Sequence, residues 1–312
     1  MAKNNGDFIS LHDLSTDQIE YLMNFALDLK TTYKNGGFTP DFLKGKTLGM
    51  IFEKSSTRTR VSFEVGMYQL GGSALFLSNR DLQLGRGEPI KDTARVLSRY
   101  LNGVMIRTFG HDRIVEFAQY ADIPVINGLS DLLHPCQVLT DLFTIREFKG
   151  KRLHDLKMAY VGDGNNMANS YLYGAAKVGM ALTVATPKSH KPNSKVLRTS
   201  AVDARKTGAE LRWTEDPVEA VKDADIVVTD TWASMGQEDE HDARKKIFAP
   251  YQVNSELLKH ADKNAIVMHC LPAYRGEEIT EDVFEENAEI IFEEAENRMH
   301  VQKAIMATLM MD

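Results

Sequence analysis

The stretch TLGMIFEKSSTRTR, residues 47–60, predicts the local fold around which the first half of the chain is organised. Its apolar half predicts a short strand at 47–52, and a helix-like spacing of apolar residues begins at Val61. The residues between them, 56–60, therefore lie at a strand-to-helix turn. A helix start leaves peptide N–H groups without partners, and the helix dipole favours an anion there.

The side chains of this turn add donors of the kind that a phosphate group requires. Ser56, Thr57 and Thr59 carry hydroxyl groups, and Arg58 carries a guanidinium suited to charge-assisted bonds with phosphate oxygens. The simpler interpretation is a capped helix start with solvated arginines. Cations and polar groups elsewhere in the chain favour the anion site.

Strand-like and helix-like segments alternate through both halves of the chain, and the pattern restarts at 157–164. Further strands are predicted at 74–77, 103–108, 181–185, 209–213, 226–229 and 266–269, and helices at 16–32, 90–100 and 137–148. Strands that alternate with helices of this length predict an α/β fold with parallel sheets. Sites on such sheets lie beyond the carboxyl ends of the strands.

The length of the chain predicts two domains, because 312 residues exceed what one hydrophobic core usually supports. We expect a first domain at 1–148 and a second at 149–312, each a parallel sheet flanked by helices, joined by interdomain helices. A C-terminal helix at 298–311 is expected to pack back on the first domain.

Composition narrows the function. The net charge is −7, from 37 basic and 44 acidic residues, which argues against a nucleic-acid partner. No apolar run approaches the roughly 20 residues that cross a bilayer, and the first residues resemble no targeting segment. Cys136 and Cys270 are the only cysteines, so no disulfide framework is expected. These features predict a cytoplasmic enzyme with no membrane partner.

Arg107 and the run His134-Pro135-Cys136-Gln137 supply further polar groups near predicted strand ends. The default reading of each is structural. Together with Arg58, however, Arg107 and His134 can stabilise negative charge that develops on a carbonyl oxygen. Gln137 can both donate and accept hydrogen bonds, as recognition of an amide-like group requires. This combination favours an acyl phosphate as ligand.

Two nucleotide-binding motifs are incomplete. Gly162-Asp163-Gly164 follows a strand, but Met167 stands at the third glycine position, and the strand at 181–185 ends without an acidic residue. A nicotinamide-dependent dehydrogenase is therefore a distant alternative. The segment at Gly45 lacks the upstream glycine of a phosphate-binding loop, so ATP binding is not expected.

Asp230 follows the predicted strand 226–229, where an Asx-turn is the structural reading. A carboxylate in that place can also bind an ammonium group, and Ser234 with nearby peptide N–H groups can hold a carboxylate. The charged run 237–246 is either a solvated surface segment or a substrate lid. Both interpretations of that run remain open.

His269 and Cys270 end the last predicted strand. A thiol nucleophile paired with an imidazole is not expected, because adjacent residues of a strand point to opposite faces. The absence of a C-x-x-C pair argues against structural zinc, so no metal is predicted.

The run Ser56-Thr57-Arg58-Thr59-Arg60 resembles the carbamoyl-phosphate signature of the aspartate/ornithine transcarbamoylase family. The likeness extends from about residue 8 to the C-terminus. The pattern D-x-x-x-S-M-G at 230–236 is similar to the loop that binds ornithine in the ornithine-specific members. Tyr274 departs from the histidine that many bacterial relatives carry after H-C-L-P.

The resemblance implies a role for each matching position. The residues expected to bind carbamoyl phosphate are Ser56, Thr57, Arg58, Thr59, Gln83, Arg107, His134, Gln137, Cys270, Leu271 and Arg298. The residues expected to bind ornithine are Asn166, Asp230, Ser234 and Met235. The residues expected to act in catalysis are Arg107, His134, Asp230, Cys270 and Arg298. Gln83 matches a residue that reaches in from a neighbouring subunit, which implies a homotrimer or a multiple of trimers.

The activity that the resemblance implies is carbamoyl transfer from carbamoyl phosphate to the δ-amine of L-ornithine, giving L-citrulline and phosphate, without a cofactor. Carbamoyl phosphate is expected to bind first. No side chain is identified as a general base, which leaves the departing phosphate as proton acceptor. The alternatives are a transcarbamoylase for putrescine or a modified ornithine, and a noncatalytic anion-binding protein.

Overall fold

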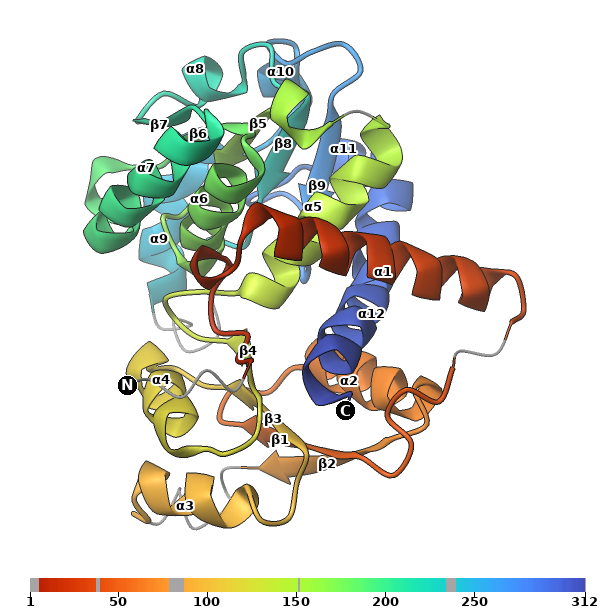
Figure 1. Ribbon diagram of the computed structural model, residues 1–312. Coiled ribbons are helices and arrows are strands. Elements are labelled where there is room, and N and C mark those ends of the chain that lie inside the picture. The colour runs from red at the N-terminus through yellow and green to blue at the C-terminus, as the bar shows by residue number, and fades with distance from the viewer. Residues whose placement is uncertain (1–5, 38–39, 79–86, 151, 234–239, 312) are drawn as a thin grey trace. The chain divides into compact units, whose positions relative to one another are not determined.

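The computed structural model describes residues 6–37, 40–78, 87–150, 152–233 and 240–311 (Figure 1). Contacts divide the chain into two compact units. Unit 1 comprises Met1–Leu139 and Asn297–Asp312, and unit 2 comprises Thr140–Glu296. Both are α/β units with parallel sheets, which confirms the predicted fold class.

Unit 1 is built on a four-stranded parallel sheet with the order β2-β1-β3-β4. Its strands are β1 (Thr47–Phe52), β2 (Ser73–Ser78), β3 (Gly103–Arg107) and β4 (Val125–Leu129). The central strands β1 and β3 are almost entirely buried, as expected for a parallel sheet covered on both faces. The edge strand β2 has no buried residue: its residues are exposed or half-buried.

The helices of unit 1 are α1 (Thr16–Lys34), α2 (Thr57–Gln69), α3 (Ile90–Leu97) and α4 (His111–Tyr120). The start of α1 confirms a predicted capping box: Ser15 Oγ accepts from the Gln18 peptide N–H, and the Gln18 side chain accepts from the Ser15 N–H. The helix α2 begins at Thr57, not at Val61, because Ser56 caps it. The candidate phosphate-binding residues 56–60 thus form the cap and first turn of the helix α2 itself.

Unit 2 is built on a five-stranded parallel sheet with the order β7-β6-β5-β8-β9. Its strands are β5 (Lys157–Val161), β6 (Ala181–Ala185), β7 (Leu211–Thr214), β8 (Ile226–Thr229) and β9 (Ile266–His269). Its helices are α6 (Asn166–Val178), α7 (Ser194–Thr207), α8 (Pro217–Val221), α9 (His241–Phe248), α10 (Ser255–Leu258) and α11 (Glu281–Glu286). An apolar cluster around Val227, Phe248 and Ile291 forms one core of this unit.

Two helices belong partly to each unit. The division at Leu139 lies inside α5 (Pro135–Lys149), and the division after Glu296 lies inside α12 (Ala288–Met310). The predicted boundary at 148/149 therefore falls at the end of α5, nearer the C-terminus than the division by contacts. The final helix begins at Ala288 instead of 298, since no glycine or proline interrupts that segment.

The last part of α12 packs within unit 1. Lys303 Nζ donates to Gln69 Oε1 at 2.8 Å, and a Cβ on Gly66 would lie 2.9 Å from Met306 Cε. The atom nearest to that Cβ is the flexible end of the Met306 side chain, so α2 and α12 approach closely at Gly66. In the described ranges, no helix combines the length and the apolar character needed to cross a membrane.

Candidate active site

The polar residues of unit 1 gather where its strand order reverses. From β1 the chain leads to β2 on one side, and from β3 it leads to β4 on the other. Ligands bind at such a crevice beyond the strands' carboxyl ends. Phe52 and Arg107, the last residues of β1 and β3, are partners in the sheet register, and the α2 turn follows Phe52.

Local hydrogen bonds determine the start of α2. The extended backbone of Ser56 lets its Oγ accept from the Thr59 peptide N–H at 3.2 Å, and Ser56 Oγ also donates to Thr59 Oγ1 at 3.1 Å. No acidic residue lies in the first turn of α2. The positive end of the helix dipole therefore has no carboxylate of its own turn to offset it.

Thr59 joins two guanidinium groups from distant parts of the chain. Arg298 Nη2 donates to Thr59 Oγ1 at 2.8 Å, and Arg107 Nη1 donates to the same oxygen at 3.5 Å. All three side chains are buried. The Thr59 hydroxyl oxygen therefore serves as a common acceptor for two charged groups.

Arg58 and Arg60 lie in one motif but have different surroundings. Arg60 pairs with Glu64 at 3.0 Å and lies over the Phe76 ring. Within the described residues, no hydrogen bond, ion pair or ring contact engages the half-buried Arg58, and its Nε is buried without a partner. Arg58 therefore has its charge available for an anion.

His134 and Gln137 follow β4 and are buried in unit 1. Burial, together with the nearby Arg298 and Arg107 guanidiniums, lowers the pKa of His134 well below its ordinary value. The imidazole is therefore neutral near pH 7 and can donate through one N–H. In the same region, burial raises the pKa of the Cys136 thiol to about 12, so Cys136 stays protonated.

In unit 2 the strand order reverses between β5 and β8, and Asp230 directly follows β8. Both of its oxygens are engaged: Oδ1 accepts from the Thr231 peptide N–H at 2.8 Å and from Cys270 Sγ at 3.2 Å, and Oδ2 accepts from Asn165 Nδ2 at 3.0 Å. The Asx-turn and a role in binding are thus compatible. The three donors are neutral, so the carboxylate keeps its charge for a cation.

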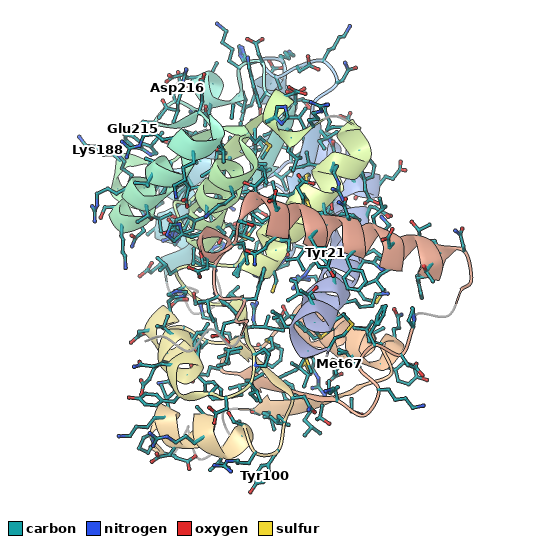
Figure 2. The ribbon with its side chains drawn as sticks, viewed as in Figure 1. Tyr21, Met67, Tyr100, Lys188, Glu215 and Asp216 are labelled. Atoms are coloured by element: carbon teal, nitrogen blue, oxygen red, sulfur yellow. The ribbon has the colours of Figure 1, made fainter. Side chains whose placement is uncertain are left out.

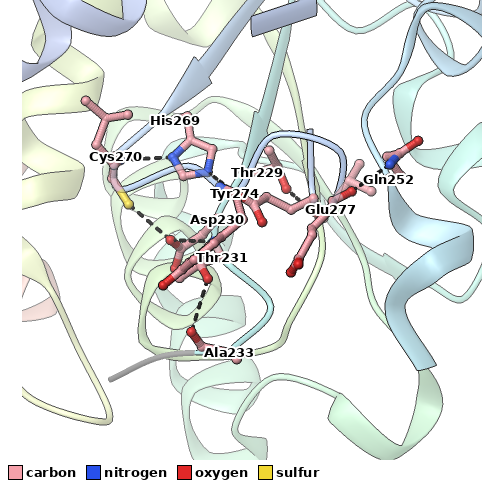
Figure 3. Close-up of polar contacts among 12 residues, drawn as sticks. Thr229, Asp230, Thr231, Ala233, Gln252, His269, Cys270, Tyr274 and Glu277 are labelled. Atoms are coloured by element: carbon pink, nitrogen blue, oxygen red, sulfur yellow. Dashed lines mark hydrogen bonds and ion pairs between the residues drawn. The ribbon is translucent and has the colours of Figure 1, made fainter. Parts of the chain in front are cut away.

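Cys270 lies beyond the end of β9 on a turn that His269 supports (Figure 3). His269 Nδ1 accepts from the Leu271 peptide N–H at 2.9 Å, while Nε2 lies 3.0 Å from Glu278 Oε1. Burial and the Asp230 carboxylate raise the pKa of the Cys270 thiol well above its ordinary value. His269 and Cys270 bond to different partners, as expected for adjacent residues of a strand, and the thiol stays protonated.

One residue of the charged run is neither solvated nor exposed. Arg244, on α9, is buried; its Nε donates to the Trp232 carbonyl at 2.5 Å and its Nη2 forms an ion pair with Asp163. Burial raises the pKa of Asp163 to about 6 in spite of this partner. The surface interpretation of 237–246 is therefore wrong for Arg244, which is bonded to the Asp230 segment.

The structure brings several of the predicted site residues into contact with one another, and others lie outside the described ranges. Ser56, Thr59, Arg107 and Arg298 are brought into contact in unit 1, and Asp230 contacts Cys270 in unit 2. Gln83, Ser234 and Met235 lie outside the described residues. Thr57, Asn166 and Leu271 lie beside these clusters: Thr57 and Asn166 are the first residues of α2 and α6, and Leu271 follows Cys270.

The sequence interpretation missed Asn165 and Glu294. Asn165 caps α6 and bonds Asp230, and its position after Gly-Asp-Gly is a helix-start signal that marks it. The buried Glu294 accepts from the His269 peptide N–H at 3.1 Å, and nothing local in the sequence marks it. In the described part of the chain, no group of three or more His, Cys, Asp or Glu residues is arranged to hold a metal ion.

The chain matches known proteins over nearly its whole length. The ornithine carbamoyltransferase of Oceanobacillus iheyensis is 56% identical over 307 residues, which cover 98% of this chain and 94% of that protein. The ornithine carbamoyltransferase of Thermococcus kodakarensis is 52% identical over 97% of this chain and 96% of its own length. The solved structure of ornithine carbamoyltransferase from Pyrococcus furiosus matches with a TM-score of 0.93 at 50% identity, over 97% of this chain and 96% of that chain.

Two family descriptions match in succession. Residues 6–147 match aspartate/ornithine carbamoyltransferase, carbamoyl-P binding domain, and residues 154–309 match aspartate/ornithine carbamoyltransferase, Asp/Orn binding domain. The first match contains Thr59 and Arg107 of the unit 1 cluster, and the second contains Asp230 and Cys270 of unit 2 together with Arg298, which completes the unit 1 cluster. The chain belongs to the aspartate/ornithine carbamoyltransferase family.

Proposed function

We propose that this protein transfers the carbamoyl group from carbamoyl phosphate to the δ-amine of L-ornithine, giving L-citrulline and phosphate. The observation that carries the proposal is the cation cluster at the start of α2, where Arg298 and Arg107 meet on Thr59 next to Arg58, which has no partner in the described part of the chain. Its chemistry suits an acyl phosphate. The relatives named ornithine carbamoyltransferase support ornithine as the acceptor.

In this proposal unit 1 binds carbamoyl phosphate. Arg58 and the first-turn N–H groups of α2 hold the phosphate, with charge-assisted bonds. Arg107, neutral His134 and the Thr59 hydroxyl stabilise the oxyanion of the tetrahedral intermediate. The full proposed set is Ser56, Thr57, Arg58, Thr59, Gln83, Arg107, His134, Gln137, Cys270, Leu271 and Arg298.

Unit 2 binds ornithine in this proposal, through Asn166, Asp230, Ser234 and Met235. Asp230 receives an ammonium group because its three donors are neutral and leave its charge uncompensated. An alkylamine has a pKa of about 10.4, so only about one molecule in a few thousand is a free amine near pH 7. The protonated Cys270 thiol contacts Asp230 and adds no second negative charge. In this proposal the uncharged thiol helps to position the δ-amine of ornithine.

Among the side chains that the structure describes near the two clusters, neither His134 nor Cys270 is a suitable acceptor for the proton that the attacking amine releases. His134 is neutral with a depressed pKa, which makes it a weak base, and Cys270 is already protonated. When the bond between the carbamoyl carbon and the phosphate oxygen breaks, that oxygen leaves with the bonding electrons, so it takes up the proton and the phosphate departs as the hydrogen-phosphate dianion. We therefore assign the proton to the leaving phosphate.

A panel of amine acceptors tests the function. Purified protein is given carbamoyl phosphate with L-ornithine, putrescine, L-lysine or an Nα-modified ornithine, and each carbamoylated product is measured with phosphate release. Citrulline formation with kcat/KM at least about 100-fold above the other acceptors supports the proposal, because pockets that pair polar substrate groups discriminate strongly. A preference for putrescine would overturn ornithine as the acceptor. Binding of carbamoyl phosphate without its consumption would indicate a noncatalytic binding protein.

We also propose that the enzyme assembles as a homotrimer or a multiple of trimers. An apolar surface supports a second copy as partner: Leu75 and Phe76 of the edge strand β2 are 49% and 40% exposed, and Tyr68 of α2 is 81% exposed. Tyr100, just beyond α3, also points away from unit 1 (Figure 2). The segment that contains Gln83 follows β2 directly.

Mixed assemblies test whether the neighbouring copy supplies Gln83. Arg58→Ala and Gln83→Ala are each expected to be nearly inactive alone. After the two variants are unfolded together and refolded, some sites combine an intact Arg58 with an intact Gln83 of another copy, so activity returns. Sedimentation should give a mass of three times 35.0 kDa, or a multiple of that. No recovery of activity in a mixed trimer would place Gln83 in its own subunit.

We place this activity in the cytoplasm, within arginine metabolism. Cys136 and Cys270 are both free thiols, which suits a reducing compartment. Fractionation of the source cells followed by assay of citrulline formation checks the location.

A further inference from the structure

We propose that Asn165 is a positioning residue that aims the Asp230 carboxylate at an ammonium group of the amino acid, and that Tyr160 holds Asn165 in place. The inference rests on the proposed function and concerns only groups of unit 2. Asn165 does not touch the substrate in this proposal. It acts by occupying one accepting direction of the carboxylate, so that a single direction is left for the ligand.

The carboxylate of Asp230 has one accepting direction left. An ionised carboxylate offers about four lone-pair directions, two on each oxygen. Oδ1 accepts from the Thr231 peptide N–H at 2.8 Å and from Cys270 Sγ at 3.2 Å, so its two directions are used (Figure 3). Oδ2 accepts from Asn165 Nδ2 at 3.0 Å, and no other described residue donates to it. The remaining direction of Oδ2 is therefore the one that an ammonium group can take.

Three donors fix which end of the Asn165 amide faces Asp230. The Oδ1 atom of the amide accepts from the peptide N–H groups of Met167 at 2.9 Å and Ala168 at 3.4 Å, and from the Tyr160 hydroxyl at 3.2 Å. Since all three partners are donors, the oxygen end points to them and the NH₂ end points to Asp230. Burial and neighbouring negative charges raise the pKa of Tyr160 well above its ordinary value, so its hydroxyl keeps the hydrogen that it donates.

The backbone beside Asn165 is also held tightly. Gly164 donates its peptide N–H to the His190 carbonyl at 3.0 Å, and a Cβ on Gly164 would lie 2.2 Å from that carbonyl oxygen. A side chain cannot fit there without moving backbone atoms, so glycine is required. Asn165 follows directly and caps α6. Its side chain thus projects from a fixed point, as a positioning role requires.

Loss of the Asn165 amide would change the direction of the Asp230 charge and leave its magnitude the same. The carboxylate would keep its donors on Oδ1 but gain a second open direction on Oδ2, so it could turn. An ammonium group would still bind to the same charge, but the amino acid would lie in more than one orientation. Attack on the carbamoyl carbon requires one orientation, and a displacement of about 1 Å can cost about 100-fold in rate. We therefore expect a large effect on kcat and a small one on KM.

The first test is Asn165→Ser. Serine caps a helix about as well as asparagine, but its single hydroxyl replaces the amide oxygen and leaves no group in the place of the NH₂. Steady-state citrulline formation should show a kcat lowered by about 10- to 100-fold, with the KM for ornithine changed less than about threefold. A wild-type kcat, or a loss confined to KM, would overturn the proposal.

The matched control is Asn193→Ser in the same unit. Asn193 caps α7 in the way that Asn165 caps α6. Its side chain accepts from the peptide N–H groups of Lys195 at 2.9 Å and Val196 at 3.3 Å. If Asn165 acted only as a cap, the two serine variants would behave alike, with a small loss of stability in urea unfolding and the same kcat. Equal kcat values in Asn165→Ser and Asn193→Ser would therefore contradict a positioning role.

Tyr160→Phe tests the second part of the proposal and keeps it refutable if Asn165→Ser does not fold. The Asn165 oxygen retains its two peptide donors in this variant, so kcat should fall by only about 2- to 10-fold at nearly constant KM. The control is Tyr173→Phe, which removes a buried hydroxyl of α6 that lies 2.7 Å from Thr199 Oγ1 and should leave kcat unchanged. A wild-type kcat in Tyr160→Phe would overturn the proposal.

Crystal structures of the wild type and Asn165→Ser give a readout that needs no turnover. The Asp230 carboxylate should hold one orientation in the wild type, and in the variant it should turn or occupy two orientations. An unchanged single orientation would overturn this inference. Citrulline formation by the wild type is scored separately: its absence removes the proposed function, and its presence with a fixed Asp230 carboxylate in Asn165→Ser removes only this inference.

Discussion

The polar clusters of the two units carry opposite charges and hold them differently. In unit 1, guanidinium groups from two distant segments gather on one hydroxyl, and Arg58 has no partner among the described residues. In unit 2, each oxygen of Asp230 is already held by neutral donors, and the nearby thiol is protonated. The first cluster gathers positive charge around one hydroxyl, and the second is a single negative charge held in a fixed direction. An anion and a cation therefore suit them respectively.

The largest effect is expected from Arg58 of unit 1, which has no partner among the described residues. Arg58→Ala should lower kcat/KM by about 100- to 1,000-fold, as loss of one donor to developing charge does elsewhere. Steady-state citrulline kinetics measure it, and circular dichroism should remain at the wild-type signal. The matched control is Arg95→Ala, an exposed guanidinium of α3 paired with Asp92, which should change the rate less than about twofold. Equal effects of Arg58→Ala and Arg95→Ala would contradict a special role for Arg58 in binding an anion.

The second effect concerns the buried carboxyl of unit 2. Burial raises the pKa of Asp163 from 3.8 to about 6, so the unfolded chain loses this proton at a lower pH than the folded chain. The folded state consequently loses stability as pH rises from about 4 to 6. Compared with Asp163→Asn, the wild type should lose on the order of 3 kcal/mol of unfolding free energy across that window.

Urea unfolding of the wild type and Asp163→Asn at pH 4, 5, 6 and 7 measures this difference directly. Other carboxyl groups cancel in the comparison because both proteins contain them. A difference that stays constant with pH would mean that the Arg244 ion pair outweighs burial and keeps the pKa of Asp163 near its ordinary value.

The third effect concerns the charge of Asp230. Asp230→Asn should raise the KM for ornithine by about 10- to 100-fold, because a hydrogen bond to a charged group is worth about 1.5–3 kcal/mol. The KM for carbamoyl phosphate should change less than about threefold. Asp216→Asn makes the same substitution at the exposed cap of α8 and preserves that cap. Loss of affinity for carbamoyl phosphate in Asp230→Asn would show that the two clusters do not bind the anion and the cation independently.

The smallest effect is expected at Cys270. A hydroxyl can replace the thiol as donor to Asp230, so Cys270→Ser should lower kcat by less than about tenfold. The raised pKa also predicts slow alkylation of the native thiol by iodoacetamide at pH 7, compared with the unfolded chain. Inactivation of the enzyme by Cys270→Ser would instead indicate that sulfur itself takes part in the chemistry.

Local patterns anticipated most elements of the fold. The strand at 47–52, the capping box at Ser15 and the strands at 181–185, 226–229 and 266–269 all appear where periodicity and turn residues predict them. Such signals depend on residues that are close together in the sequence, so one sequence is enough to find them. The same reasoning placed Arg58 at a helix start and Asp230 at a strand end, since both positions depend on elements only a few residues away.

Other features depend on residues that the chain brings together from far apart. Neither the bond between Arg298 and Thr59 nor that between Glu294 and His269 has a local pattern, because their partners lie 239 and 25 positions away. Burial of Arg244 was likewise hidden within a run that reads as solvated. Sequence alone thus named the chemical groups and the elements that present them. Packing assigned their partners, because burial and pKa are set by neighbours in space.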